Sequence, residues 1–354
     1  MKILDRIIGH MIINSTFLVS AVIIGIQSFL SLIRQFQFVG QHGYSMWQAF
    51  LFVLMQLPAQ FYQLFPIAGF LGALIGLSRL SSTSQLIVMR VSGVSVMRIT
   101  GSVIKASVLM IIVVTAIGEG FGPLWQQQSE QVQQLVLSPP KHASILESVW
   151  LHQGNGFTHI SQLTKRDMMM DITHYRFVSD GHLSQATVAQ SGRLIDGQWR
   201  LSHLKKTVFH QDHVSIETER HSNLHVAFQP ELQVQMSIIS GEQSMKDLYQ
   251  TIHYRHSIGL GTNQFVFTFW QRLLQPITSL VMICLAVPFV FGSFRSASMS
   301  VRMMAGVFIG FGFYMLNQLF GPITLVYQFP PVLAALLPTC LFLLIAIILL
   351  ARTP

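Results

Sequence analysis

Six long apolar runs limit the fold of this chain more than any other feature of its sequence. A transmembrane helix needs about 20 consecutive, mostly apolar residues to cross the hydrocarbon core of a bilayer. Runs of roughly this length or longer occur at about residues 11–33, 48–78, 100–121, 265–291, 303–320 and 332–351. The sequence therefore predicts a membrane protein with six transmembrane helices. Only 10% of its residues are charged, against about 25% in soluble domains, which agrees with this prediction.

The segment between residues 135 and 245 has a different character. No apolar run in it could cross a membrane, and polar residues alternate with Val, Ile, Leu, Phe and Tyr, as in half-buried strands. Asp180-Gly181 and Asp196-Gly197 are dipeptides typical of tight hairpin turns. We expect a mixed membrane protein in which a β-sandwich or β-jelly roll is inserted between two sets of three helices. The predicted domains are residues 1–134 with the first three helices, residues 135–245 with the β-domain, and residues 246–354 with the last three helices.

The basic residues of the short loops predict the orientation of the chain. On one side of the membrane these loops contain nine basic residues and a single acid, Asp5, whereas the opposite short loops, 34–46 and 321–331, contain only Arg34. Since Lys and Arg are enriched in cytoplasmic loops, we predict that both termini are cytoplasmic and that the β-domain is periplasmic. The net charge of +8 then reflects orientation, and no nucleic-acid partner is expected. The nine residues are Lys2, Arg6, Arg79, Arg90, Arg98, Lys105, Arg295, Arg302 and Arg352.

The sequence lacks the motifs of several enzyme classes. It has no G-x-x-x-x-G-K-[ST] loop for nucleotide phosphates, no H-E-x-x-H zinc motif and no G-x-S-x-G nucleophile elbow. No acidic residue occurs between Asp5 and Glu119 or after Asp247, which argues against an intramembrane aspartyl protease and against an ion-coupled carrier. We therefore expect a chain that is not an enzyme and binds no cofactor itself, so that any ATP and Mg²⁺ would be bound by a partner.

Metal binding is also not expected. Both cysteines, Cys284 and Cys340, lie inside predicted helices and offer neither a disulfide framework nor a metal site. Twelve of the fourteen histidines lie between His142 and His256, but they form no regular ligand set with carboxylates or cysteines. We interpret them as polar positions on solvated strands.

Prolines and glycines inside the predicted helices indicate bends and close packing. Prolines occur in the second helix, at Pro58 and Pro66, and in the fourth helix. They should bend or break these helices. The stretches "GFLGALIGL" and "AGVFIGFGF" carry small residues that let helices approach closely. This pattern fits packing within the subunit and an interface between subunits about equally well.

Several stretches of the chain resemble the LptF/LptG permease family, and the resemblance covers essentially the whole chain. The most specific is "FGSFRSASMSVRMMAGVFIGFGFYMLNQLFGPITLVYQFPP", and shorter ones are "LDRIIGHMI", "FPIAGFLGALIGL", "VMRVSG" and "AIGEGFGP". The chain looks closer to the G-type (LptG) members than to the F-type members. The resemblance implies a permease subunit of the lipopolysaccharide export ABC transporter in the inner membrane of a Gram-negative bacterium. Its partners would be an LptF-like permease, two LptB-like ATPase subunits and an LptC-like protein with a single helix, and its substrate lipopolysaccharide.

Such a substrate needs an apolar cleft for its acyl chains and cations at the outer mouth for its phosphates. Arg34 ends the first helix on the predicted periplasmic side, and Arg272, at the outer start of the fourth helix, is a weaker second candidate. The alternative for the aromatic candidates is ordinary packing or lipid contact. The apolar candidates for the wall of the cleft are Phe29, Phe61, Phe65, Phe313, Leu316 and Phe320.

The cytoplasmic loop "SSTSQLIVMRVSG" predicts a short helix at about residues 83–93. It begins with residues that cap helices well and ends at Gly93, a residue that commonly terminates helices. We expect this helix to contact the ATPase, although a helix lying on the lipid surface is an alternative. Gln85 stands where the family resemblance implies a Glu, so a charge pair with the ATPase would be missing. The candidate coupling residues are Gln85, Leu86, Ile87, Met89, Arg90 and Gly93.

Two hypotheses of function remain open at this stage. In the first, the chain is a transport permease that extracts lipopolysaccharide toward the periplasm while a partner hydrolyses ATP. In the second, it is a membrane scaffold whose β-domain docks periplasmic envelope-assembly factors without transporting anything. Copurification with an ATPase would distinguish them, because a pure scaffold should not bind one.

Overall fold

The computed structural model describes most of the chain. The described residues are 2–137, 146–153, 155–165, 168–178, 182–195, 198–210, 213–224, 243–257, 261–292 and 298–352. The chain divides into two compact units. Met1–Leu137 and Asn263–Pro354 form one of them, called the membrane unit below, and Ser138–Thr262 forms the other, called the β unit. The second boundary between the units therefore follows residue 262. The boundary predicted from the sequence followed residue 245.

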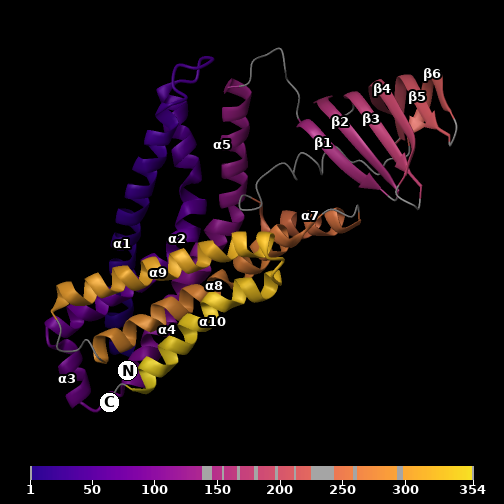
Figure 1. Ribbon diagram of the computed structural model, residues 1–354. Coiled ribbons are helices and arrows are strands. Elements are labelled where there is room, and N and C mark those ends of the chain that lie inside the picture. Colours follow the sequence, from indigo (N-terminus) through magenta and orange to yellow (C-terminus); the bar gives the residue numbers. More distant parts are fainter. Residues whose placement is uncertain are drawn as a thin grey trace. The chain divides into compact units, whose positions relative to one another are not determined.

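Among its described residues, the membrane unit contains six helices that are long and apolar enough to cross a membrane, as the sequence predicted. The candidate spans lie in α1, α2, α4 with α5, α8, α9 and α10. Several of these helices are longer than the apolar runs. For example, α1 has 35 residues, or about 50 Å at 1.5 Å per residue. In Figure 1, α1, α2 and α5 continue together beyond the region where they cross α8, α9 and α10. The helices of this unit are α1 (Lys2–Phe36), α2 (Met46–Ser82), α3 (Gln85–Val91), α4 (Val96–Gly120), α5 (Gly122–Leu137), α8 (Asn263–Phe291), α9 (Met299–Val326) and α10 (Pro331–Ala351).

The core of the membrane unit is built around α2 and α8. Phe70 and Leu74 of α2 and Met282 of α8 are fully buried in one cluster to which α1, α4, α9 and α10 also contribute. The prolines do not break these helices, because α2 continues through Pro58 and Pro66. Likewise, α8 continues through its two prolines. Of the predicted bend or break, the structure therefore excludes a break at these prolines.

The glycine-rich faces pack helices of the same subunit against one another. A Cβ added at Gly72 of α2 would collide with the backbone of Thr16 of α1, and one at Gly76 would lie 3.3 Å from the Met11 carbonyl oxygen. A Cβ at Gly310 of α9 would lie 3.1 Å from Cγ2 of Ile67. Of the two interpretations of these glycines, the structure supports packing within the subunit.

The β unit contains one antiparallel sheet of six described strands, which confirms the inserted β-domain. Each strand pairs with its neighbours in sequence, so the order is β1-β2-β3-β4-β5-β6 (Figure 1). This is an up-and-down order within a single sheet, and the described residues contain no second sheet of a jelly roll. The predicted turn dipeptides lie outside the described residues. The elements are β1 (Leu146–Gln153), β2 (Gly156–Lys165), β3 (Met168–Phe177), β4 (Leu183–Ile195), β5 (Gln198–Phe209), β6 (Val214–Leu224) and the helix α7 (Met245–Ser257).

One face of the sheet is buried along a row of paired residues. Ile160 of β2 lies opposite Ile172 of β3, which lies opposite Ala189 of β4, and Ala189 in turn faces Leu204 of β5. All four are at most 4% exposed. Because side chains alternate between the faces of a strand, this row explains the alternation that was visible in the sequence.

Candidate functional site

Arg34 lies in the last turn of α1 and is exposed. Its Nη2 donates a hydrogen bond of 2.9 Å to Oγ of Ser31, which holds the side chain against its own helix. A cation at this position also interacts favourably with the negative end of the helix dipole. The guanidinium therefore remains accessible to a ligand at this end of the helix.

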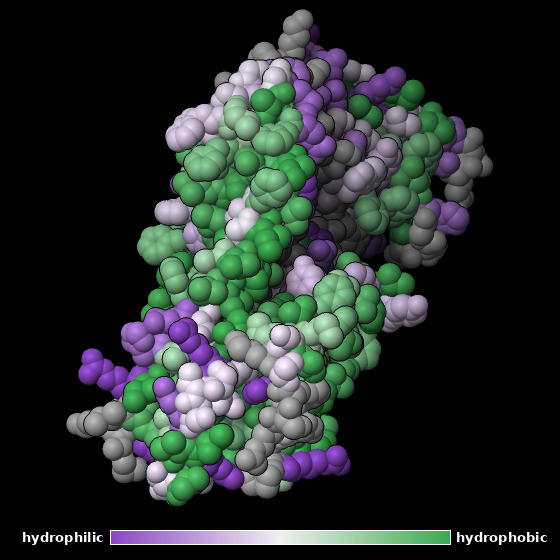
Figure 2. All heavy atoms as spheres, turned by 90° about the vertical axis from the view of Figure 1, so that its left-hand side faces the viewer, coloured by the Kyte–Doolittle hydropathy of each residue, from purple (hydrophilic) through white to green (hydrophobic). Residues whose placement is uncertain are grey.

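The surface of α1 below Arg34 is apolar and exposed. Phe29, a predicted substrate contact, is 63% exposed, and Leu18, Ile26 and Ile33 are between 46% and 61% exposed. Figure 2 looks onto the side where α1 lies in Figure 1, and apolar side chains cover much of this face. An isolated soluble chain rarely exposes so much contiguous apolar surface, so this face suits lipid or a partner helix.

The other predicted apolar contacts are interior residues of the membrane unit. Phe65 is 2% exposed and Phe313 is 3% exposed. Phe313 packs edge-to-face on Phe342 at 5.2 Å between ring centroids. Phe61 and Leu316 are partly buried against the same core cluster. Phe320 packs against a smaller cluster around Phe267 and Leu274.

The exposed apolar residues of α9 are different ones and include Phe308, Phe311, Met315 and Leu319. A pattern in the sequence does indicate which residues of α9 face the core. Gly310 marks the face of α9 that packs on α2, and Phe313 lies one turn further along the same face. Residues on that face are placed toward the core by helical geometry.

Arg272, the second predicted cation, is paired inside the membrane unit. Its Nη1 donates a 2.8 Å hydrogen bond to Oε1 of Glu119, and the two side chains are 12% and 17% exposed. Tyr62 donates its hydroxyl to the carbonyl oxygen of Arg272 at 3.2 Å, and Gln275 Nε2 donates to the carbonyl oxygen of Tyr62 at 3.0 Å. This network links α2, α4 and α8, so the charge of Arg272 is compensated within the chain.

The single acidic residue of the predicted cytoplasmic loops is also paired with basic residues of the same chain. Asp5 of α1 accepts hydrogen bonds from Arg98 and Lys105, each at 3.3 Å, and from the hydroxyl of Ser102. These three residues lie on one face of α4, since they are spaced at about one helical turn. The cluster fastens the start of α1 to α4.

The predicted short helix is present as α3. The residue that ends it was predicted correctly, whereas the capping of its start was not. Ser84 at its start has φ 60° and makes no side-chain capping hydrogen bond, so the predicted N-cap was wrong. The C-terminal stop at Gly93 is confirmed, with φ +86°. The backbone N–H of Gly93 donates to Arg90 O and that of Val94 donates to Met89 O, which are the two hydrogen bonds of a Schellman motif.

The exposed apolar surface of α3 consists of Ile87, Val88 and Val91, which are 52%, 63% and 83% exposed. Two predicted coupling residues do not belong to it. Leu86 is 3% exposed and Met89 is partly buried, and both pack in the core cluster of the chain itself. The choice of Leu86 and Met89 as partner contacts is therefore corrected, because a helix on a protein surface turns about half of its apolar residues inward. Gln85 and Arg90 are exposed.

In the β unit, the described residues contain no group of three His, Cys, Asp or Glu side chains that could hold a metal ion. His174 of β3 instead has a structural environment. Its Nδ1 lies 2.9 Å from Oγ1 of Thr158, and burial, with the nearby charge of Arg176 as a smaller cause, lowers the pKa of its imidazole. This histidine is therefore neutral at pH 7.

Comparison with known proteins identifies relatives over the full length of the chain. The family described as lipopolysaccharide export system permease LptF/LptG matches residues 6–352. The lipopolysaccharide export system permease protein LptG of Haemophilus influenzae is 29% identical over 355 residues, which cover 99% of this chain and 98% of that protein. The protein of the same name from Escherichia coli K12 is 28% identical over 353 residues, with the same coverage.

Proposed function

Because the chain belongs to the LptF/LptG family of lipopolysaccharide export permeases, we propose that it extracts lipopolysaccharide from the outer leaflet of the inner membrane of a Gram-negative bacterium. The lipid would pass from the membrane unit toward the β unit. The observation that carries the proposal is the family match, which includes both units. ATP hydrolysis in a partner subunit would supply the energy.

The surface of α3 supports docking of that partner. The sequence has no phosphate-binding loop of its own, so an ATPase must act through a contact surface. Ile87, Val88 and Val91 present exposed apolar side chains at the connection between two candidate spans. Such a helix suits an apolar groove on a soluble protein. Two LptB-like ATPase subunits would bind a heterodimer of this chain and an LptF-like permease, with an LptC-like single helix as a further partner.

The outer end of α1 supports entry of the substrate. Lipopolysaccharide combines acyl chains with phosphate groups, and α1 combines an exposed apolar face with the exposed guanidinium of Arg34 at its end. Arg binds phosphate through paired charge-assisted hydrogen bonds. Acyl chains would lie against the α1 face that includes Phe29, and Arg34 would contact a phosphate.

The proposed orientation places both termini and α3 in the cytoplasm and the β unit in the periplasm. Its support is the distribution of Lys and Arg among the short loops. With this orientation α3 faces the compartment that contains ATP. The β unit then lies on the side where exported lipid leaves the membrane.

Coexpression tests the proposal. The chain would be coexpressed with F-type permease, LptB and LptC candidates, purified through a tag on this chain, and analysed by mass spectrometry for bound proteins and lipid. We expect an ATPase and lipopolysaccharide in the purified complex. A folded chain that retains neither of them would support a scaffold without transport activity.

A further inference from the structure

Arg302 is a buried cation without a hydrogen-bond partner for two of its nitrogens. It lies near the start of α9 and is 6% exposed. Neither Nε nor Nη1 has a hydrogen-bond partner among the residues that the structure describes. Burying an uncompensated charge is strongly unfavourable, so a guanidinium in this position calls for an anion.

The described residues provide no ion pair for Arg302. The sequence segments of the membrane unit contain only three acidic residues, Asp5, Glu119 and Glu130. Asp5 is paired with Arg98 and Lys105, and Glu119 with Arg272. Within the membrane unit, Glu130 is therefore the acidic side chain that remains to be considered as a partner of Arg302; the other candidate is an anion from another molecule.

Helix packing places Glu130 far from Arg302. Going from Gly310 to Gly306 in α9, the nearest side chains of α2 advance from Ile67 to Leu74, so α9 and α2 are antiparallel. One further turn brings Arg302 to the end of α2 that leads into α3. Glu130 lies on α5, which packs on α2 at the other end, where a Cβ at Gly122 would lie 3.4 Å from Ala59.

The first turn of α9 adds favourable features for an anion. The N-terminus of a helix directs backbone N–H groups and the positive end of the dipole outward. Side chains on a helix point back toward its N-terminus, so Arg302, in the fourth position after the N-cap Ser298, extends toward that same end. The Arg302 side chain and the backbone N–H groups of the first turn are thus directed toward the same end of α9.

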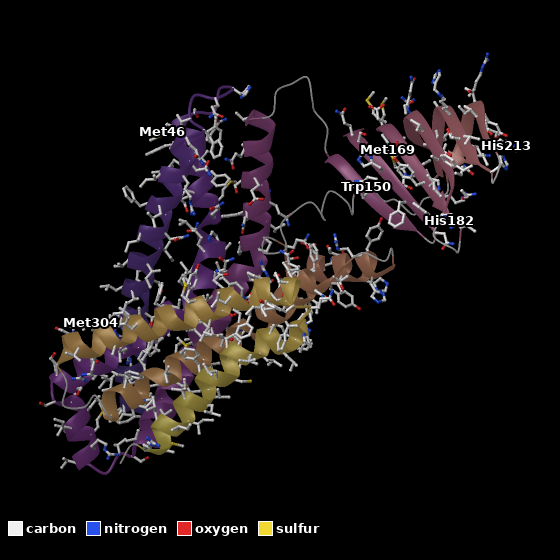
Figure 3. The ribbon with its side chains drawn as sticks, viewed as in Figure 1. Met46, Trp150, Met169, His182, His213 and Met304 are labelled. Carbon is white, nitrogen blue, oxygen red and sulfur yellow. The ribbon has the colours of Figure 1, made fainter. Side chains whose placement is uncertain are left out.

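An apolar track continues along α9 from this end. Met304, Val307, Phe308 and Phe311 are between 52% and 69% exposed. Met304 is labelled near the start of α9 in Figure 3. These residues lie on the side of α9 turned away from α2, opposite to Arg302, and the two sides meet only at the first turn of the helix. A phosphate bound at this turn, with acyl chains along the outward side, would match the two parts of a phospholipid.

We propose that an anionic phospholipid binds at the start of α9, with its phosphate diester at Arg302 and the first-turn amides and its acyl chains along Met304, Phe308 and Phe311. Basic sites between membrane helices are suited to anionic headgroups. In the proposed orientation this lipid belongs to the cytoplasmic leaflet and is distinct from the exported substrate, which would enter from the outer leaflet. The lipid site does not depend on the transport function.

The test uses the purified full-length chain in neutral detergent. Its thermal unfolding would be followed during titration with dioleoylphosphatidylglycerol, with dioleoylglycerol, which lacks the phosphate, or with inorganic phosphate. We expect phosphatidylglycerol to raise the Tm and the other two additives to have little effect. A full shift with inorganic phosphate would overturn the lipid assignment in favour of a free anion, and an equal shift with dioleoylglycerol would overturn the phosphate contact.

Substitutions of Arg302 test whether this residue forms the lipid site. Arg302→Gln should weaken the apparent affinity for phosphatidylglycerol by about tenfold, whereas Arg79→Gln, which removes an exposed Arg of α2, should leave it unchanged. Arg302→Lys keeps the charge and should retain most of the response. Equal responses in Arg302→Gln and the unmodified chain would contradict the proposal.

A second measurement does not depend on how the variants fold. A phosphatidylglycerol analogue with a diazirine in its acyl chain would be photolysed on the unmodified chain, and the adducts would be mapped by mass spectrometry. We expect adducts concentrated between residues 301 and 311. Adducts spread evenly over the exposed helices, or a Tm response that appears only when partner proteins are bound, would overturn the lipid site, the latter in favour of a partner carboxylate.

Discussion

At the scale of single residues, the charges of the membrane unit divide into paired and accessible groups. Glu119 and Arg272 neutralise each other between α4 and α8, and Asp5 is bound by side chains of α4. Arg34 is exposed and contacts only a neutral hydroxyl among the partners that the described residues provide. Arg34 and Arg272, the two arginines that the sequence offered as phosphate contacts, thus have different environments.

Removing one member of the buried pair should destabilise the membrane unit. Arg272→Ala leaves the carboxylate of Glu119 buried, which should cost about 3–5 kcal/mol. The measurement is the Tm of the purified chain. The double variant Arg272→Gln with Glu119→Gln removes both charges and should recover much of the loss, because no unpaired charge remains. A Tm unchanged by Arg272→Ala together with lost lipopolysaccharide binding would instead favour Arg272 as a substrate contact.

Reversing the charge of Arg34 should weaken substrate binding without affecting stability. A photo-crosslinker at Leu30, one helical turn from Arg34 and 49% exposed, should form an adduct with lipopolysaccharide. Arg34→Glu should reduce this adduct about tenfold through repulsion of phosphate, while Arg34→Lys should retain most of it. Equal adducts in the Glu and Lys variants would exclude a phosphate contact at this position.

At the scale of elements, α3 has one inward and one outward apolar face. Leu86 and Met89 pack in the core of the chain, and Val88 lies on the opposite face at 63% exposure. The helix is held by its Schellman motif at Gly93 and by these inward contacts. Its outward face is therefore available to a partner without unfolding of α3.

A charge on the outward face of α3 should prevent docking of the ATPase without preventing folding of the chain. Val88→Asp should abolish copurification of the ATPase, since a carboxylate would be buried unpaired in the contact. The Tm of the variant should stay near that of the unmodified chain. Leu86→Asp is the contrasting variant, because it places a charge in the core and should prevent folding. Normal ATPase copurification with Val88→Asp would mean that the ATPase binds elsewhere.

Sequence patterns were sufficient to predict the helices and the sheet, but not to predict which aromatic residues are buried. Six apolar runs and one alternating segment predicted the helices and the inserted sheet, because these patterns follow directly from helix and strand periodicity. The buried positions Phe65 and Phe313 were assigned to a substrate wall, because an aromatic stripe in a membrane helix looks the same whether it faces lipid, ligand or core. The small residues Gly306 and Gly310 indicate in the sequence which side of α9 is closely packed, but the identity of the helix on that side depends on contacts between residues more than 200 positions apart, such as Gly306 with Leu74.

At the scale of the whole molecule, the orientation can be tested by chemical labelling. In a chain without its natural cysteines, a cysteine near Gln190 in β4 should react with a membrane-impermeant reagent from the periplasm, and one at Ser82 at the end of α2 should not. The reason is the excess of basic residues in the loops on the side of Ser82. Reactivity only at Ser82 would reverse the orientation and place the proposed ATPase contact in the wrong compartment.

The most direct test of the transport function is the ATP-dependent movement of lipopolysaccharide into the β unit. The complex would be reconstituted in vesicles that contain lipopolysaccharide, with photo-crosslinkers at Thr187 and Val188, neighbours on β4 that point to opposite faces of the sheet. We expect a lipopolysaccharide adduct in at least one of these positions that forms with ATP and is absent without it. Failure to form an adduct with ATP, or equal adducts with and without ATP, would contradict the role of this chain as an ATP-driven permease.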